Sequence, residues 1–134
     1  MKFVVDTNIL FSFFWKSSIT RKLLLTSNFE LISPRTALEE LKKYSKEIIN
    51  KTKISKKEFN SELTNLRKII NFINKLEYSS FLREAGKISP DKDDADFLAL
   101  CLKFNCFLWS NDYILKNQDK VKILSTEEII EVLF

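Results

Sequence analysis

The sequence predicts an α/β protein with three layers, an α/β/α sandwich in which helices cover both faces of a central parallel sheet. Two patterns support this fold class. Short apolar runs alternate along the chain with longer segments whose apolar residues recur at helical spacing, and this alternation is typical of βαβ units. The first run, Phe3–Val5, is apolar at every position, as expected of a strand that is covered on both faces.

Four short strands are predicted from these runs. They are Lys2–Asp6, Phe29–Ile32, Cys106–Trp109 and Val121–Leu124. Helices are predicted from the apolar spacing in the other segments. Their apolar residues lie in Ile9–Trp15, Thr20–Leu25, Leu38–Ile49, Phe59–Ile73, Phe97–Phe104 and Ile129–Phe134. The segment Leu76–Phe81 is ambiguous.

Three helices also have start signals. Ser33-Pro34 has the form of an N-cap followed by proline at the first helical position, and this helix is expected to continue to about Ile49. Ser55–Glu58 and Ser125–Glu128 each fit a capping box, in which serine and glutamate side chains accept from each other's backbone N–H groups.

Length and composition exclude several classes of protein. A chain of 134 residues fits a single domain, residues 1–134. The absence of histidine excludes Ser-His-Asp and Cys-His triads and histidine-containing zinc sites. The single glycine, Gly86, excludes the glycine-rich loops that bind nucleotide phosphates. Cys101 and Cys106 are too few for a disulfide framework, and the chain has no membrane span or secretion signal, so we expect a cytoplasmic protein.

The charges are unevenly distributed along the chain. Residues 1–90 contain 17 basic and 9 acidic side chains, whereas residues 91–134 contain 5 and 9. Lys42–Lys57 alone has seven lysines and one glutamate. A basic segment beside an acidic cluster fits a protein that binds a phosphate backbone near a metal site. A solvated, lysine-rich helix face is the simpler interpretation of the same lysines.

Several carboxylates are expected at the carboxyl edge of the sheet, where parallel sheets bind their ligands. Asp6 ends the first strand, Asp112 follows another, and Asp91–Asp96 precedes a helix. Glu40 lies about two turns into its helix. Such like charges repel each other unless a divalent cation binds, and Mg²⁺ or Mn²⁺ suits a site whose ligands are all oxygen.

Each of these residues also has an ordinary structural interpretation. Asp6 can cap a helix, Asp112 can occupy a turn, and Glu40 can be a solvated helix former. Some aspartates in Asp91–Asp96 are expected to cap the helix that follows and to interact with its dipole. The metal site is therefore predicted from the joint spacing and not from any single residue.

Four motifs together resemble the PIN domain family. They are Asp6-Thr7-Asn8-Ile9-Leu10 after a hydrophobic strand, Glu40-Leu41 in a helix, Asp94-Ala95 leading into Phe97–Leu100, and Ser110-Asn111-Asp112 after an apolar strand. The resemblance extends from Lys2 to the terminal helix. It implies a PIN-like three-layer fold and an Mg²⁺- or Mn²⁺-dependent ribonuclease. Within this family, the sequence is similar to the VapC-like members, many of which are the toxins of VapBC-type toxin–antitoxin pairs.

The resemblance also implies roles for particular residues. The acidic quartet of the family, which is both catalytic and metal-binding, corresponds to Asp6, Glu40, Asp94 and Asp112. Within the dense acidic cluster, Asp96 is the alternative to Asp94 as the residue that corresponds to the family's ligand. The polar positions beside the first and last aspartates correspond to Thr7, Asn8 and Ser110, and we expect them to bind substrate.

The implied reaction is metal-dependent hydrolysis of RNA phosphodiester bonds. Bound cations can activate water and stabilise the charge that develops on the phosphate, so no histidine is required. Lys42, Lys43 and Lys46 lie in or near the helix of Glu40 and are candidates for holding RNA phosphates. The implied partners are RNA and, for a toxin, an antitoxin protein.

The aromatic run Phe11, Phe13, Phe14 and Trp15 has two interpretations. Core packing is the default, but exposed aromatic residues in the early helices would favour a homodimer interface.

Two other functions compete with the nuclease. A non-catalytic PIN-like module that binds RNA or protein is disfavoured, because it has no need of four mutually repelling carboxylates. A phosphatase of the haloacid dehalogenase type needs a second aspartate two residues after the first, where this chain has Asn8.

Overall fold

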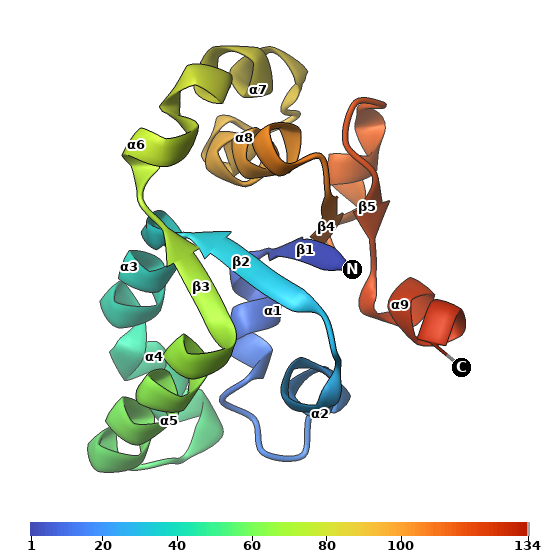
Figure 1. Cartoon of the computed structure of the whole chain (residues 1–134). Helices are drawn as coiled ribbons and strands as arrows, with labels where there is room; N and C mark the ends of the chain where they lie inside the picture. The colour runs from blue at the N-terminus through green and yellow to red at the C-terminus, as the bar shows by residue number, and fades with distance from the viewer. Residues whose placement is uncertain (134) are drawn as a thin grey trace.

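The computed structural model describes residues 1–133, and its centre is a sheet of five parallel strands (Figure 1). The strands are β1 (Lys2–Val5), β2 (Glu30–Pro34), β3 (Ile70–Ile73), β4 (Phe107–Trp109) and β5 (Ile123–Leu124). Their order across the sheet is β3-β2-β1-β4-β5, so β1 is central. Because every neighbouring pair is parallel, the carboxyl ends of all five strands lie along one edge.

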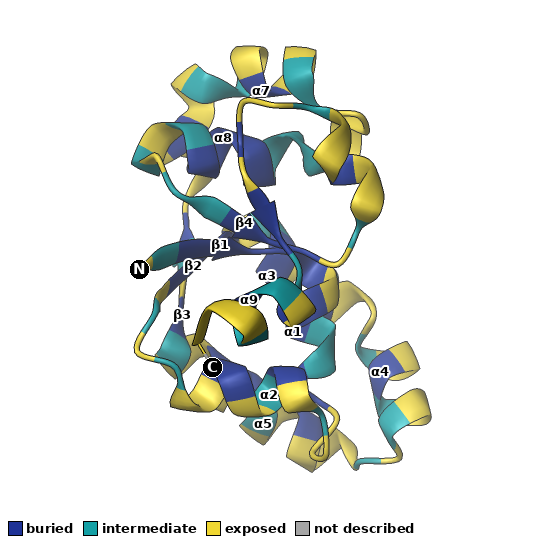
Figure 2. Cartoon of the chain, turned by 90° about the vertical axis from the view of Figure 1, so that its right-hand side faces the viewer, coloured by how far each residue is buried: buried dark blue, intermediate teal, exposed yellow. Residues whose placement is uncertain are grey.

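Helices cover both faces of this sheet (Figures 1 and 2). One face is covered by α6 (Lys75–Tyr78), α7 (Leu82–Ile88) and α8 (Ala95–Phe104). On the other side lie α1 (Thr7–Ser12), α2 (Ile19–Thr26), α3 (Arg35–Lys43), α4 (Ser45–Thr52), α5 (Lys56–Ile69) and α9 (Thr126–Leu133). The predicted three-layer α/β class is therefore confirmed. None of the helices within residues 1–133 is both long and apolar enough to cross a bilayer.

The core is built around β1, which is dark blue in Figure 2 along its apolar residues. Phe3 is 1% exposed, and Val4 and Val5 are fully buried. Trp109 in β4 is also fully buried, and its indole N–H donates a hydrogen bond of 3.0 Å to Thr126 Oγ1. This bond satisfies the polar end of a large core residue and links β4 to the start of α9.

The aromatic run divides between the core and the surface. Phe13 and Phe14 are buried, and the Phe14 ring stacks on Phe59 of α5 with 4.9 Å between ring centroids. The core interpretation is confirmed for these two residues. Phe11 is half-buried and Trp15 is 37% exposed, so these two are open to a partner or ligand.

The middle of the chain differs from the prediction at two points. The single helix expected to reach Ile49 is divided at Tyr44 into α3 and α4, because the Tyr44 backbone departs from helical geometry, with φ −97° and ψ 18°. Ile70 and Ile73, which fit the spacing of the preceding helix, lie instead in strand β3. The chain passes from α5 into β3 with no intervening loop, and both isoleucines are buried against β2.

The start signals have mixed outcomes. Both capping boxes form, at Ser55–Glu58 before α5 and at Ser125–Glu128 before α9. Ser33, however, is a strand residue, and its hydroxyl donates to the Val5 carbonyl of β1. Pro34 ends β2 and occupies the N-cap position, so α3 begins one residue later than expected. Phe134, expected in the last helix, lies outside the described residues.

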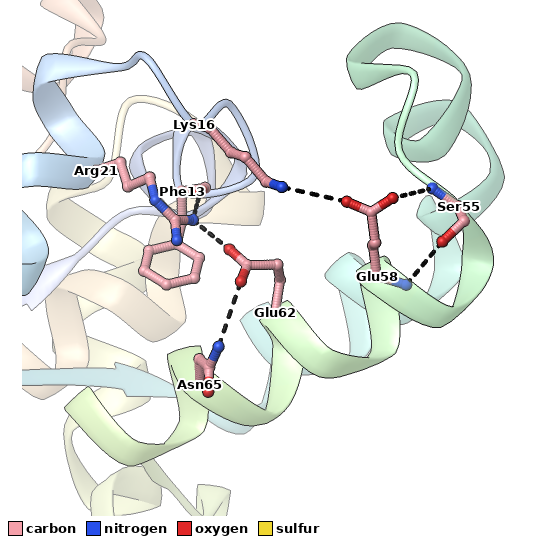
Figure 3. Close-up of polar contacts among 7 residues, drawn as sticks. All are labelled: Phe13, Lys16, Arg21, Ser55, Glu58, Glu62 and Asn65. Carbon is pink, nitrogen blue, oxygen red and sulfur yellow. Dashed lines mark hydrogen bonds and ion pairs between the residues drawn. The ribbon is translucent and has the colours of Figure 1, made fainter.

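A polar network joins α2 to α5 and fixes the turn after α1 (Figure 3). The Arg21 guanidinium donates to the Phe13 carbonyl and to Glu62, and lies 4.3 Å from the centroid of the Phe13 ring. The Arg21 and Glu62 side chains are 17% and 14% exposed. A second pair, Lys16–Glu58, also reaches α5 but is 66% and 49% exposed.

Arg21→Ala should therefore destabilise the fold strongly. Removing the guanidinium leaves Glu62 largely buried without its cation, and breaking a buried pair in this way costs about 3 kcal/mol. Lys16→Ala is the matched control, because it removes an exposed pair to the same helix and should change stability by less than about 0.5 kcal/mol. Urea unfolding of both variants measures the difference, and equal losses would show that the Arg21 network has no special role.

Candidate active site

Asp6 and Asp112 meet at the carboxyl edge of the sheet, as the sequence predicts. Asp6 directly follows β1, and Asp112 follows β4, the neighbouring strand, in which Trp109 pairs with Val5. Ser110 links the two aspartates. Its hydroxyl donates to Asp6 Oδ2 at 2.6 Å, while the backbone N–H of Asp112 donates to Ser110 Oγ at 3.1 Å.

The capping interpretation fits Asp112 but not Asp6. Asp6 occupies the N-cap position of α1, yet its side chain accepts no capping hydrogen bond. Asp112 Oδ1 accepts the backbone N–H of Ile114 at 3.0 Å and so caps the short helical turn Tyr113–Asn117. Asp6, a residue only 7% exposed, thus places its carboxylate at the sheet edge without a role in helix capping.

The structure gives different roles to the aspartates of the acidic cluster. Asp91 Oδ1 caps the turn Lys92–Asp94 by accepting the backbone N–H of Asp93. Asp96 Oδ2 accepts a hydrogen bond of 2.5 Å from the Tyr78 hydroxyl. Asp94 stands at the N-cap of α8 but makes no capping bond with its side chain. Asp94 is half-buried, and its carboxylate has neither a capping role nor a hydrogen bond like that of Asp96.

Repulsion and burial raise the pKa values of three of the four predicted ligands. The pKa of Asp94 rises to about 7, first because of burial and then because of neighbouring carboxylates, among them Asp6 and Asp112. Burial also raises the pKa of Asp6, although the Ser110 hydrogen bond opposes this effect. The pKa of Glu40 in α3 is raised by burial and by the charge of Asp6. The charge of Asp6 acts on Glu40 and Asp94, and the charge of Asp112 acts on Asp6 and Asp94, so the four carboxylates are linked through Asp6.

This cluster has the chemistry of a cation site. None of its four carboxylates forms an ion pair within residues 1–133. The hydroxyl Oγ1 of Thr7, next to Asp6, is buried and has no hydrogen-bond partner. Unpaired carboxylates beside an orphaned hydroxyl fit a hard cation such as Mg²⁺ or Mn²⁺ with its bound water.

The donor groups are not yet arranged as a closed cage. Over residues 1–133, no three acidic or thiol side chains converge closely enough to hold a metal ion. Glu40, Asp94 and Asp112 are each partly exposed. The residues therefore fit a divalent cation by their chemistry, and binding requires the carboxylates to rotate toward one another.

The other predicted site residues are dispersed. Asn8 is exposed on α1. Lys43 lies near the acidic cluster, where its charge acts on Glu40. Lys42 and Lys46 instead line a separate hollow of about 340 Å³ between α4 and α5, together with Lys56.

One residue of the site was missed by sequence reasoning. Tyr78 in α6 is fully buried, and its hydrogen bond to Asp96 in α8, a helix of the same layer, reaches the edge of the acidic cluster. Burial raises its pKa, so the phenol stays protonated and donates the bond. Its segment, Leu76–Phe81, was ambiguous, and only the pairing of α6 with α8 identifies the contact.

The raised pKa of Asp94 predicts how the stability of the metal-free protein depends on pH. Its folded-state pKa of about 7 lies above the ordinary value of 3.8, so the folded chain binds more protons between these values. The contribution of Asp94 to stability is therefore lost as pH rises toward 7. Melting temperatures in EDTA should fall more steeply from pH 5 to pH 8 in the wild type than in Asp94→Asn. Asp119→Asn, at an exposed position whose charge is not among the causes that raise the Asp94 pKa, is the control, and identical slopes in wild type and Asp94→Asn would contradict the assignment.

Together, the parallel sheet and the carboxylates at its carboxyl edge define an α/β protein with an acidic site suited to divalent cations. The family model described as PIN domain matches residues 4–132, and the chain belongs to the PIN domain family. PIN domains are generally nucleases and generally use divalent metal ions.

A solved structure supports the fold. One chain from the crystal structure of VapBC2 from Rickettsia felis, which is bound to a promoter DNA fragment, is similar in fold. It superposes on this protein with a TM-score of 0.60. The sequences are 20% identical, and the match covers 93% of this chain and 98% of that one. No curated protein matches the sequence.

Proposed function

We propose that this protein is a metal-dependent endoribonuclease that hydrolyses RNA phosphodiester bonds. The observation that carries the proposal is the cluster of Asp6, Glu40, Asp94 and Asp112, which are linked by charge repulsion through Asp6 and form no ion pair within residues 1–133. A functional reason is needed for such a cluster, because unpaired buried charge is costly to the fold. Family membership supports the same chemistry.

The residues have distinct proposed roles. Asp6 and Asp94 would hold the cation directly, and Glu40 and Asp112 would complete its ligands directly or through water. The bound cation would supply an activated water and stabilise negative charge on the phosphate. Ser110 fixes the orientation of the Asp6 carboxylate through its 2.6 Å hydrogen bond. Lys43, whose charge acts on Glu40, would bind a phosphate of the RNA.

We also propose a toxin role with an antitoxin protein as a partner, which the fold likeness to the VapBC2 chain supports. We also propose a homodimer, in which exposed Trp15 contributes to the contact. Sedimentation at high protein concentration tests this second point, and a monomer would contradict it.

The alternative is a PIN domain that binds RNA or protein without cutting. One observation favours it, namely that no three acidic side chains of residues 1–133 already form a metal cage. Only the nuclease needs a divalent cation for turnover, so metal dependence distinguishes the two functions.

Cleavage of a labelled RNA of mixed sequence separates these functions. The purified protein should cut the RNA with Mg²⁺ or Mn²⁺ and stop cutting when EDTA is added. A folded protein that binds Mn²⁺ and RNA but leaves every RNA intact would favour the non-catalytic module.

A further inference from the structure

The two cysteines of the chain lie together at the end of α8, away from the acidic cluster. Cys101 is in the last turn of this helix, and Cys106 directly precedes β4. Asn105, between them, has the left-handed conformation with φ 50°, and its backbone N–H donates to the Cys101 carbonyl. The backbone N–H of Cys106 donates to the same carbonyl. This second bond is typical of a Schellman helix end, which folds the sixth residue back against the first.

The side chains of the two cysteines are also in contact. The Cys101 thiol donates a hydrogen bond to the Cys106 sulfur. The backbone bond between the same residues, 3.2 Å from the Cys106 nitrogen to the Cys101 carbonyl oxygen, holds the two positions together. A disulfide joins residues whose Cα atoms are roughly 4.4–6.8 Å apart and whose Cβ atoms face each other, and direct contact between the thiols is consistent with this geometry.

The two thiols differ in access and in reactivity. Cys101 is 2% exposed, whereas Cys106 is half-buried and open to a small solute. The hydrogen bond from Cys101 lowers the pKa of the Cys106 thiol. Burial opposes this shift, the charge of Lys2 adds to it, and Glu30, the ion-pair partner of Lys2, again opposes it. Burial raises the pKa of Cys101, so the pair combines an accessible thiolate with a protonated neighbour, as redox-sensitive pairs do.

We propose that Cys106 is a site of reversible oxidation by hydrogen peroxide and that Cys101 converts the oxidised form into an intramolecular disulfide. The proposal is independent of RNA cleavage, because neither cysteine belongs to the acidic cluster. It assigns a role to two residues that the proposed mechanism does not use.

The reaction has two steps, and both release water. The Cys106 thiolate attacks one peroxide oxygen, so an S–O bond forms, the O–O bond breaks, and the departing hydroxide takes up the thiol proton. The Cys101 sulfur then attacks the Cys106 sulfur, so the S–S bond forms and the S–O bond breaks. The hydroxyl group leaves with the Cys101 proton as a second water. In total the two thiols lose two electrons, and one peroxide is reduced to two waters.

Thiol labelling and peptide mapping test this reaction in the wild-type protein. The chain has only these two cysteines, so labelling of the denatured protein with N-ethylmaleimide measures their free thiols alone. Both thiols should be lost together after treatment with hydrogen peroxide, and dithiothreitol should restore both. Lys103 lies between the cysteines, so after trypsin only the disulfide joins residues 93–103 to residues 104–116. Intact mass alone is not sufficient, because Met1 is 58% exposed and also reacts with peroxide.

Single substitutions separate the roles of the two cysteines. Cys101→Ala should still be oxidised at Cys106, but as a sulfenic acid that dimedone traps and not as a disulfide. Cys106→Ala is the matched control, and its buried Cys101 should lose its thiol at least about tenfold more slowly than the wild type. The peptide map of the wild type does not depend on the folding of either variant.

The outcomes decide the proposal. Linked peptides 93–103 and 104–116 that dithiothreitol separates would uphold it, whether or not the protein cleaves RNA. Thiols that stay free at peroxide concentrations that oxidise glutathione would overturn it and leave the pair as an apolar contact of the helix end. A disulfide between two chains, or equally fast thiol loss in Cys106→Ala, would also overturn it.

Discussion

Asp6→Asn is expected to lower RNA cleavage by about 10³-fold, because it removes the charge of the ligand placed most firmly at the sheet edge. Asp6 is 7% exposed, and its position is fixed by Ser110 and by β1. The amide oxygen of asparagine can still accept the Ser110 hydrogen bond, so the fold should be preserved. Rates measured on a labelled RNA with Mn²⁺, together with circular dichroism, test both parts.

Asp119→Asn is the matched control for this variant. Asp119 is exposed in the turn before β5 and is not among the groups that affect the pKa values of the cluster. It should cleave RNA at the wild-type rate. A folded Asp6→Asn protein with full activity would remove Asp6 from the mechanism and would indicate a contaminating nuclease.

Asp94→Asn is expected to have the second-largest effect, a loss of about 10²-fold in cleavage with a gain in the stability of the metal-free protein. The gain follows from removing one of several repelling carboxylates. Asp96→Asn should lower cleavage less than tenfold, because the Asp96 carboxylate is already engaged by Tyr78. Cleavage rates and melting temperatures in EDTA measure the two effects.

The comparison of these two variants also tests which aspartate is the ligand. If Asp96→Asn loses cleavage and Asp94→Asn retains it, then the roles are reversed. In that case Tyr78→Phe should also impair cleavage, because the Tyr78 hydroxyl would orient the true ligand.

The central part of the site could be predicted from sequence because one geometric rule governs it. In a parallel sheet the residues that follow neighbouring strands meet at one edge, and this rule brought Asp6 and Asp112 together. The rule also needs the strand order, which apolar patterning does not provide. The family resemblance predicts Glu40 and Asp94 near the same edge, and the charge of Asp6 raises the pKa values of both.

The misassigned segments have physical causes. Ile70 and Ile73 repeat at the spacing of a helix, and only pairing with β2 makes them a strand. The break at Tyr44 has no proline or glycine to signal it. The lysines were grouped by nearness in sequence, but Lys42 and Lys46 line the hollow beside α5, and only Lys43 acts on Glu40.

The contact between Tyr78 and Asp96 shows a further limit. The two residues are 18 positions apart in the sequence, and the helix that contains Tyr78 was not predicted. Contacts of this kind depend on how the helices of one layer pack, and neither periodicity nor capping signals describe that packing.

Diffraction from crystals grown with Mn²⁺ tests the central claim most directly, because the anomalous signal locates the ion without relying on activity. We predict a Mn²⁺ peak about 2.1 Å from carboxylate oxygens of Asp6 and Asp94, with Glu40 and Asp112 turned toward it. The same crystals of Asp6→Asn should lose the peak. A cluster without Mn²⁺ at saturating concentration, in a wild-type protein that binds Mn²⁺ elsewhere, would contradict the claim that these carboxylates form a metal-dependent active site.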